Sequence, residues 1–249
     1  MSVQYDLDLL LVAPYPAALW EKVVPELALK CRVHTIYLGN LPSVSAMSDY
    51  VLSLAPQRFA YAGYCLAAYV GLNIHRHEPQ RMAGMAFING AASTDGATRR
   101  EIRRQRIEKL QLKLERSVYP EKLYLENAAR WLLSPRSSPS EDLLSSAIEL
   151  LSEIPISHSL SHQKALEDRG DYRSEYVRPN FPQITIGGRD DRVCPPVDVE
   201  ASVAAGTVTF IEACGHLAPL EKPALVAQYL STWLADIQSN DQTRGIRYG

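Results

Sequence analysis

The chain has 249 residues, 46% of them hydrophobic, and a formal net charge of −2 at pH 7. This length allows one large core, and the near-neutral charge argues against a global attraction to nucleic acid or to an anionic membrane. The first eight residues are polar and include two acids, so they do not suit a signal peptide.

The four cysteines are widely separated and show no paired C-x-x-C spacing. In a chain of this length, such spacing argues against a disulfide framework. We therefore expect reduced thiols and a cytoplasmic location. The cysteines are Cys31, Cys65, Cys194 and Cys214.

The first third of the chain alternates between strand-like and helix-like segments. Leu7 to Ala13 is almost continuously apolar, as expected for a strand that is buried on both faces. The same alternation predicts a helix over Ala17–Leu29, a strand over Arg32–Leu38, a helix over Ser45–Leu54, a strand from Phe59, a helix ending near Arg76 and a strand over Met82–Ile88.

The alternation stops between Ser93 and Pro179, where every periodic segment is helical. It resumes with strands predicted over Pro182–Ile186 and Val208–Ile211, and with helices over Val197–Ala205 and Ala224–Ala235. This order predicts a mostly parallel α/β sheet of about six strands flanked by helices. Residues 1–92 and 180–249 would form the core, and residues 93–179 would form an inserted helical cap.

The segment around Cys65 combines a short apolar run, a turn with small flanking residues and a helical pattern. Gly63 and Ala67 lie two residues before and two residues after Cys65. A sharp strand-to-helix turn needs small residues there, because the two backbones come close. Cys65 is therefore a candidate nucleophile, and a buried structural cysteine is the alternative reading.

Two later turns carry an acid and a histidine. Asp190 and Asp191 follow a strand and a glycine pair, at the edge where open α/β sheets place their sites. Gly215 and His216 directly follow the last predicted strand.

These three segments resemble motifs of the α/β-hydrolase superfamily. Gly63-x-Cys65-x-Ala67 is similar to G-x-S-x-G but has cysteine for serine and alanine for the last glycine. The turn before Pro195 resembles G-x-x-D-x-x-x-P with Asp191 as the acid, although a one-residue shift would select Asp190. The stretch from Cys214 to Pro223 matches C-G-H-x-x-x-x-E-x-P. The order of nucleophile, acid and histidine is the one expected for this fold.

The resemblance implies a catalytic triad of Cys65, His216 and Asp191, with a covalent acyl-enzyme on Cys65. It also implies an oxyanion hole formed by the backbone N–H groups of Tyr15 and Leu66, although Ala13 and Pro14 depart from the superfamily's His-Gly segment. The chain would begin at the central strand, with a reduced N-terminus.

The expected activity is cleavage or transfer of an acyl group from an ester, thioester or lactone. Some superfamily members with cysteine at this position are dienelactone hydrolases, polyester synthases and thioesterases. No metal or cofactor is expected. The candidate substrate-binding residues are Tyr64, Tyr119, Tyr124, Trp131 and Leu217.

Other readings stay open. Cys65 could stand in place of a native serine. The protein could also be a cyclase or lyase, a lapsed enzyme that binds a ligand, or a metalloprotein with ligands Cys65, Cys194, Cys214 and His216. Its oligomeric state, monomer or homodimer, is not determined.

The first helix of the insertion is rich in arginine and lysine from Arg99 to Arg116. Such a run is most often a solvated face. It could alternatively dock an acidic carrier protein or the phosphates of coenzyme A, either of which would tether the acyl substrate.

Overall fold

The structure is a computed structural model, and it describes residues 7–116, 122–136, 140–176, 180–202 and 208–246. They form a six-stranded parallel sheet in the order β2-β1-β3-β4-β5-β6. The predicted parallel α/β architecture is thus confirmed. The strands are β1 (Asp8–Ala13), β2 (Arg32–Tyr37), β3 (Phe59–Tyr64), β4 (Met82–Ile88), β5 (Gln183–Gly188) and β6 (Val208–Ile211).

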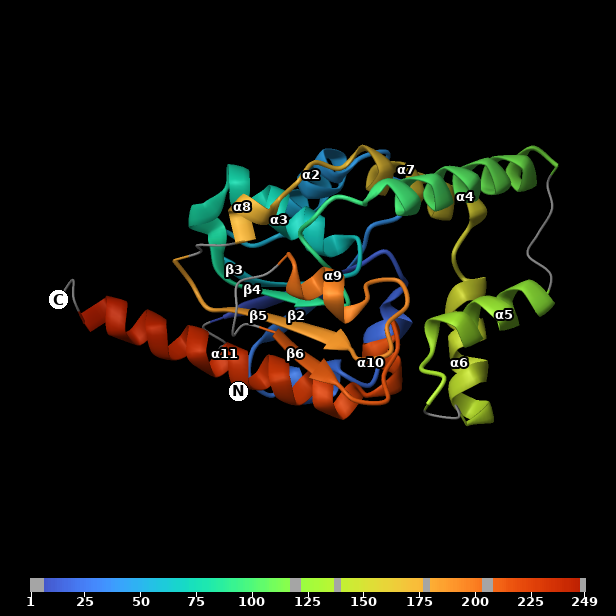
Figure 1. The fold of residues 1–249 in the computed structure, drawn as a ribbon. Coiled ribbons are helices and arrows are strands. Elements are labelled where there is room, and N and C mark those ends of the chain that lie inside the picture. The colour runs from blue at the N-terminus through green and yellow to red at the C-terminus, as the bar shows by residue number, and fades with distance from the viewer. Residues whose placement is uncertain (1–6, 117–121, 137–139, 177–179, 203–207, 247–249) are drawn as a thin grey trace.

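Helices cover both faces of the sheet, with α2 (Val44–Leu54) and α3 (Ala67–His77) on one face and α11 (Pro223–Ile246) on the other (Figure 1). Successive residues of β1 point to opposite faces, as the strand period of two requires. Leu9 and Leu11 pack in the cluster that includes α11, whereas Leu10 and Val12 pack in the cluster that includes α2 and α3. Both sets are fully buried, which explains why β1 reads as a continuous apolar run.

We call the helices between β4 and β5 the inserted helices: α4 (Ala97–Glu115), α5 (Lys122–Leu132), α6 (Glu141–Ser152), α7 (Ile156–Asp168) and α8 (Arg173–Tyr176). Of these helices, α4, α5 and α6 lie beyond the carboxyl ends of the strands, whereas α8 lies beside α3 (Figure 1). The described part of residues 93–179 contains helices but no strand. Residues of α5 and α6, such as Ala129 and Leu150, share a buried cluster with α11, so these helices extend the core.

The structure differs from the predicted elements in several helices, and the helix predicted over Val197–Ala205 already ends at Glu200 as α9 (Pro196–Glu200). The helix predicted over Ala17–Leu29 is broken into a 3-10 turn, η1 (Ala17–Trp20), and one turn of α-helix, α1 (Val24–Leu27). A continuous helix would place Pro25 in its interior, where proline lacks the N–H donor and clashes with the preceding turn. The last helix, α11, is also longer than predicted.

Three short elements complete the described structure: η2 (Pro79–Arg81), α9 (Pro196–Glu200) and α10 (Ala218–Glu221). A search of the described residues finds no helix with the length and hydropathy needed to span a bilayer.

Candidate active site

Cys65 occupies the turn between β3 and α3, with a backbone φ of 53°. A non-glycine residue in this left-handed region is strained by about 1–2 kcal/mol. Its backbone N–H donates to the carbonyl of Ile88 at 2.9 Å, which ties the turn to the end of β4. A Cβ atom on Gly63 would lie 2.5 Å from the carbonyl oxygen of Ala67, so this position tolerates only glycine. The turn therefore holds the Cys65 side chain in one place at the end of the sheet.

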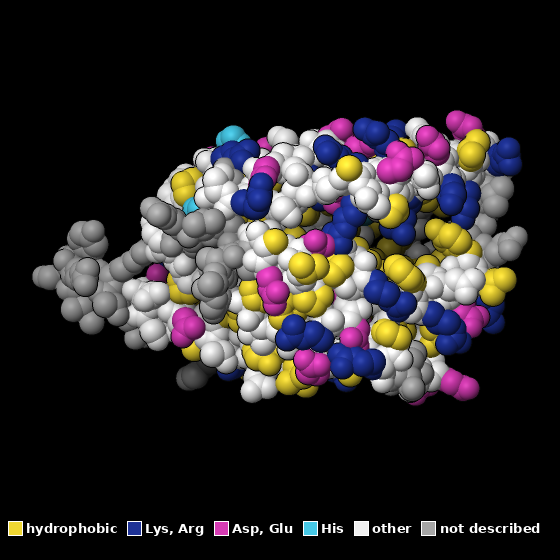
Figure 2. Space-filling view, in the orientation of Figure 1, with side chains coloured by type: hydrophobic (Ala, Val, Ile, Leu, Met, Phe, Trp, Pro, Cys, Tyr) yellow, Lys and Arg dark blue, Asp and Glu magenta, His cyan; other side chains and the backbone are white. Residues whose placement is uncertain are grey.

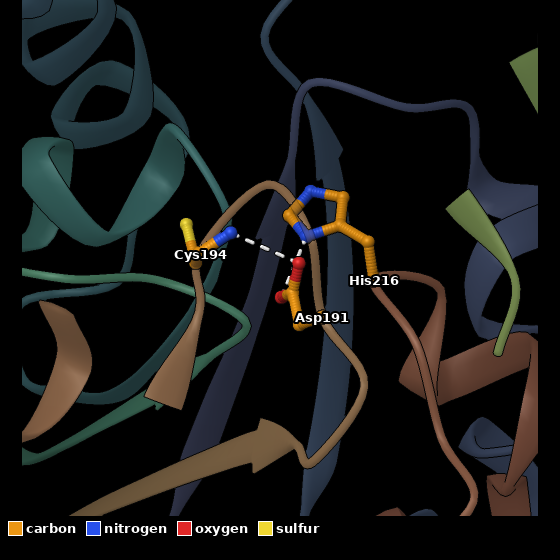
Figure 3. A group of neighbouring side chains, drawn as sticks. All are labelled: Asp191, Cys194 and His216. Carbon is orange, nitrogen blue, oxygen red and sulfur yellow. Dashed lines mark hydrogen bonds and ion pairs between the residues drawn. The ribbon is translucent and has the colours of Figure 1, made fainter. Parts of the chain in front are cut away.

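Asp191 follows β5, and four hydrogen bonds hold its buried carboxylate; Figure 3 draws those with Cys194 and His216. Oδ1 accepts from the backbone N–H groups of Val193 and Cys194 at 2.8 and 2.9 Å. Oδ2 accepts from Nδ1 of His216 and from Nδ2 of Asn89, both at 2.9 Å. The orientation of the carboxylate is therefore set from both sides.

The neighbouring acid, Asp190, faces elsewhere. Its carboxylate accepts from Nε of Arg136 at 2.8 Å and from the hydroxyl of Ser134. The hydrogen bond from Arg136 lowers the pKa of Asp190. The one-residue ambiguity in the sequence is thus resolved, because Asp191 is the acid that contacts His216.

The loop that carries His216 is held by elements far apart in sequence. The backbone N–H of His216 donates to the carbonyl of Leu132 at 2.7 Å, and the backbone carbonyl of His216 accepts from the Tyr64 hydroxyl at 2.6 Å. The carboxylate of Glu221 accepts from the N–H groups of Gly215 and Ser134, both at 2.9 Å. These contacts fasten the loop to the end of α5, and they give the glutamate of the histidine motif a structural role.

The His216 ring is buried, with 2% of its side chain exposed. Burial on its own would lower its pKa. The charge of Asp191, the charge of Cys65 and hydrogen bonds to both side chains act in the opposite direction and raise the pKa of His216 to about 10. The two neighbouring side chains therefore outweigh the effect of burial.

Asn89 is a site residue that the sequence analysis missed. It is fully buried, has a φ of 49°, and donates through Nδ2 to both Asp191 Oδ2 and the carbonyl of Gly215, the latter at 3.1 Å. It thus links the acid to the residue before His216. Its position at the carboxyl end of β4, which pairs with β5, is the signal that could have identified it.

A cavity of about 440 Å³ extends from Cys65 beneath the inserted helices. Its lining includes Tyr15 and Leu66 beside Cys65, and Tyr124 and Trp131 from α5. Figure 2 shows a hollow in this region, bordered by hydrophobic and basic side chains. We call this space the apolar lobe.

A second lobe of about 320 Å³ shares Tyr15, Cys65 and Leu66 with the first and adds Cys194 and His216. We call it the basic lobe because arginines dominate its charged lining. Cys65 therefore lies where the two lobes meet.

The remaining predicted substrate residues lie elsewhere. Tyr64 and Leu217 are fully buried and do not belong to the described lining of either lobe. Tyr64 instead supports the His216 loop through its hydroxyl group. Tyr119 lies outside the described residues.

Asp191, Cys194 and His216 place possible metal-ligand atoms within 4.8 Å of one another (Figure 3). The Asp191 oxygens already accept four hydrogen bonds, as described above. Burial, followed by the charge of Asp191, raises the pKa of Cys194 well above its usual value and favours the neutral thiol, a weak ligand. Cys214 is buried next to the Gly215 carbonyl and is not part of this group. The arrangement suits an acid–imidazole pair better than a metal centre.

Comparison with solved structures identifies the fold. An esterase from Thermogutta terrifontis with malate bound has a TM-score of 0.77 at 21% identity, covering 94% of this chain and 91% of that one. The enol-lactonase from Burkholderia xenovorans LB400 has a TM-score of 0.76 at 15% identity, covering 93% and 92%. The chain has the α/β-hydrolase fold, as its motifs predict.

Sequence comparison finds a more local likeness. The pimeloyl-[acyl-carrier protein] methyl ester esterase of Edwardsiella ictaluri (strain 93-146) is 32% identical over 80 residues, which span 29% of this chain and 31% of that relative. No family model matches the chain.

Proposed function

We propose that this protein is an acyl-transferring α/β hydrolase that acts on an ester, thioester or lactone through Cys65, His216 and Asp191. The observation that carries the proposal is the position of Cys65. It lies in a strained turn where both lobes of the cavity meet, and it lines the basic lobe together with a histidine that a buried carboxylate orients. Covalent acyl catalysis requires a nucleophile, a base beside it and an acid that orients the base.

Before the first chemical step, the Cys65 thiol has given its proton to Nε2 of His216. The Cys65 thiolate attacks the acyl carbon, and the negative charge moves to the carbonyl oxygen. The N–H groups of Tyr15 and Leu66 are the proposed donors to this oxyanion, each contributing about 3 kcal/mol. The carbon–leaving-group bond then breaks, and His216 gives its proton to the departing oxygen or sulfur. Asp191 stabilises the imidazolium until that transfer.

The product of this step is a thioester on Cys65, which water, an alcohol or an amine can resolve. Because a thioester reacts readily with alcohols and amines as well as water, cysteine favours acyl transfer or lactone chemistry over simple hydrolysis. The inserted helices would act as a cap that excludes water from the apolar lobe. The names of the esterase, methyl ester esterase and enol-lactonase relatives support an ester or lactone substrate.

Intact-mass measurement after incubation with 4-nitrophenyl butyrate tests this function. We expect one butyryl group per chain, located on Cys65 by peptide mapping. A lapsed, ligand-binding protein would gain no acyl group, and its Cys65 would react with iodoacetamide no faster than free glutathione does. Acylation of another residue would also contradict the proposal.

The raised pKa of His216 makes a prediction for pH dependence. Because the protonated ring supplies the leaving-group proton, kcat/KM should fall as the pH rises through about 10. The His216 pKa is higher in the folded chain than the ordinary value of about 6.5, so the His216–Asp191 ion pair stabilises the fold fully below that pH and loses its contribution as the pH rises to about 10. A profile of kcat/KM against pH, with unfolding measured in parallel, checks both. An alkaline limb near pH 7 would contradict this assignment.

A further inference from the structure

The charged residues that line the basic lobe are strongly unbalanced. Among its described lining, five arginines face two aspartates, an excess of 5 − 2 = 3 positive charges beside Cys65. His216 lines the same lobe. The arginines are Arg99, Arg103, Arg106, Arg169 and Arg192, and the aspartates are Asp95 and Asp198.

Part of this excess is buried. Asp95 lies between two guanidinium groups, at 2.6 Å from Arg103 and 2.7 Å from Arg169. The exposed fractions of the three side chains are only 6%, 15% and 4%, respectively. One carboxylate cannot neutralise two buried guanidinium groups, and an uncompensated buried charge is costly. This cluster therefore favours a second anion.

The other arginines differ in their pairing. Arg99 is paired with Asp198. Arg106 lines both lobes, and it has no ion pair within the described part of the chain. Arg106 is therefore the cation at the junction of the lobes with the fewest protein partners.

The position of His216 assigns one substrate part to each lobe. In the proposed mechanism, His216 protonates the leaving group, so the leaving group must lie on the same side of the acyl carbon as the ring. His216 lines the basic lobe but does not belong to the described lining of the apolar lobe. The acyl group then occupies the apolar lobe, among residues such as Leu110, Leu125, Leu151 and Ile154.

We propose that the substrate joins an uncharged, apolar acyl group to a leaving group that carries a carboxylate or phosphate close to the scissile bond. The anion would bind the arginines of the basic lobe, because guanidinium groups match both carboxylate and phosphate geometry. This inference rests on the proposed acyl-transfer function and names its substrate class.

A matched pair of esters tests the inference. The substrates 4-nitrophenyl butyrate and 3-carboxy-4-nitrophenyl butyrate differ by one carboxylate on the leaving group. After division by the rates of uncatalysed hydrolysis, we expect kcat/KM to favour the anionic ester by about tenfold. The preference should fall as NaCl is raised, since the lobe is open to solvent.

Two variants and a matched control locate the effect. Arg106→Gln and Arg103→Gln should each reduce the preference severalfold, and the second leaves Asp95 paired with Arg169. Arg100→Gln removes an exposed charge from the same helix but not from the cavity lining, so its preference should equal that of the original protein. If all three variants lost the same part of the preference for the anionic ester, the effect would come from the overall positive charge of the helix. That result would contradict an anion site formed by Arg103 and Arg106. A misfolded variant is recognised from its circular dichroism and set aside, and the preference of the original protein still decides the question.

A second pair distinguishes the source of the anion. S-butyryl pantetheine and its 4′-phosphate compare a neutral with a phosphorylated thiol, while the ester pair reports on a carboxylate. A preference in either pair supports the inference and names the anion. If Cys65 is acylated but neither pair shows a preference for its anionic member, the inference fails and the proposed function stands. If none of the substrates acylates Cys65, the proposed function itself fails.

Discussion

Replacement of Cys65 by alanine should lower kcat/KM for ester substrates by about 10⁴-fold or more, since loss of the nucleophile from a catalytic triad removes most of its rate enhancement. The acyl adduct seen by intact mass should also disappear. Residual turnover would come only from the oxyanion donors and the bound geometry.

Cys194→Ala is the matched control, because it removes a second thiol from the same lobe. Asp191 accepts from the backbone N–H of Cys194, which this variant keeps, so acylation of Cys65 should persist. If Cys194→Ala abolished acylation and Cys65→Ala did not, the nucleophile would be misassigned.

The variant Cys65→Ser tests whether the protein is adapted to a cysteine nucleophile or to a serine nucleophile. A serine hydroxyl is a much weaker acid than a thiol, so His216 generates an alkoxide less readily than a thiolate. Cys65→Ser should therefore be slower than the original protein on the same substrate. Equal or faster turnover would indicate that Cys65 replaces a native serine.

Asp191→Asn should lower kcat/KM by about 10³–10⁴-fold, because it removes the charge that stabilises the His216 imidazolium and orients its ring. The substitution preserves side-chain shape, so folding should be retained. The alkaline limb of the pH profile should also move to lower pH, since the main group that raises the His216 pKa would be neutral.

Asp190→Asn provides the control at the adjacent position. It weakens the exposed contact with Arg136 and the part-buried contact with Ser134, and it leaves the His216 hydrogen bond in place. We expect its kcat/KM to stay within a few-fold of the original value. A larger loss from Asp190→Asn than from Asp191→Asn would transfer the role of the acid to Asp190.

The strands and the turn around Cys65 could be predicted from the sequence because their signals are local. β1 and β4 read as apolar runs since both of their faces are buried. Small residues flank Cys65 because Gly63 lies against the Ala67 carbonyl, a contact within five residues of chain. The apolar period over Ala17–Leu29 predicts one helix, but Pro25 lies inside that range and the structure has a break there.

The composition of the site was less predictable because its contacts join distant segments. Asn89 and Asp191 are 102 residues apart, and Tyr64 reaches the His216 carbonyl across 152 residues. The choice between Asp190 and Asp191 depends on which carboxylate the β5 turn directs toward the His216 loop. No local pattern distinguishes two adjacent acids in a turn.

The amino-acid order alone was sufficient for the α/β-hydrolase fold and for placing Cys65, Asp191 and His216 in turns that follow strands, since strand burial and tight turns impose their requirements on neighbouring residues. Three-dimensional packing was needed to select Asp191, to bring Asn89 to it, and to place one lobe of apolar side chains and another of arginines on either side of Cys65. Those features arise where inserted helices meet the ends of the sheet, and the pairing of segments so far apart follows from the whole core rather than from any one stretch.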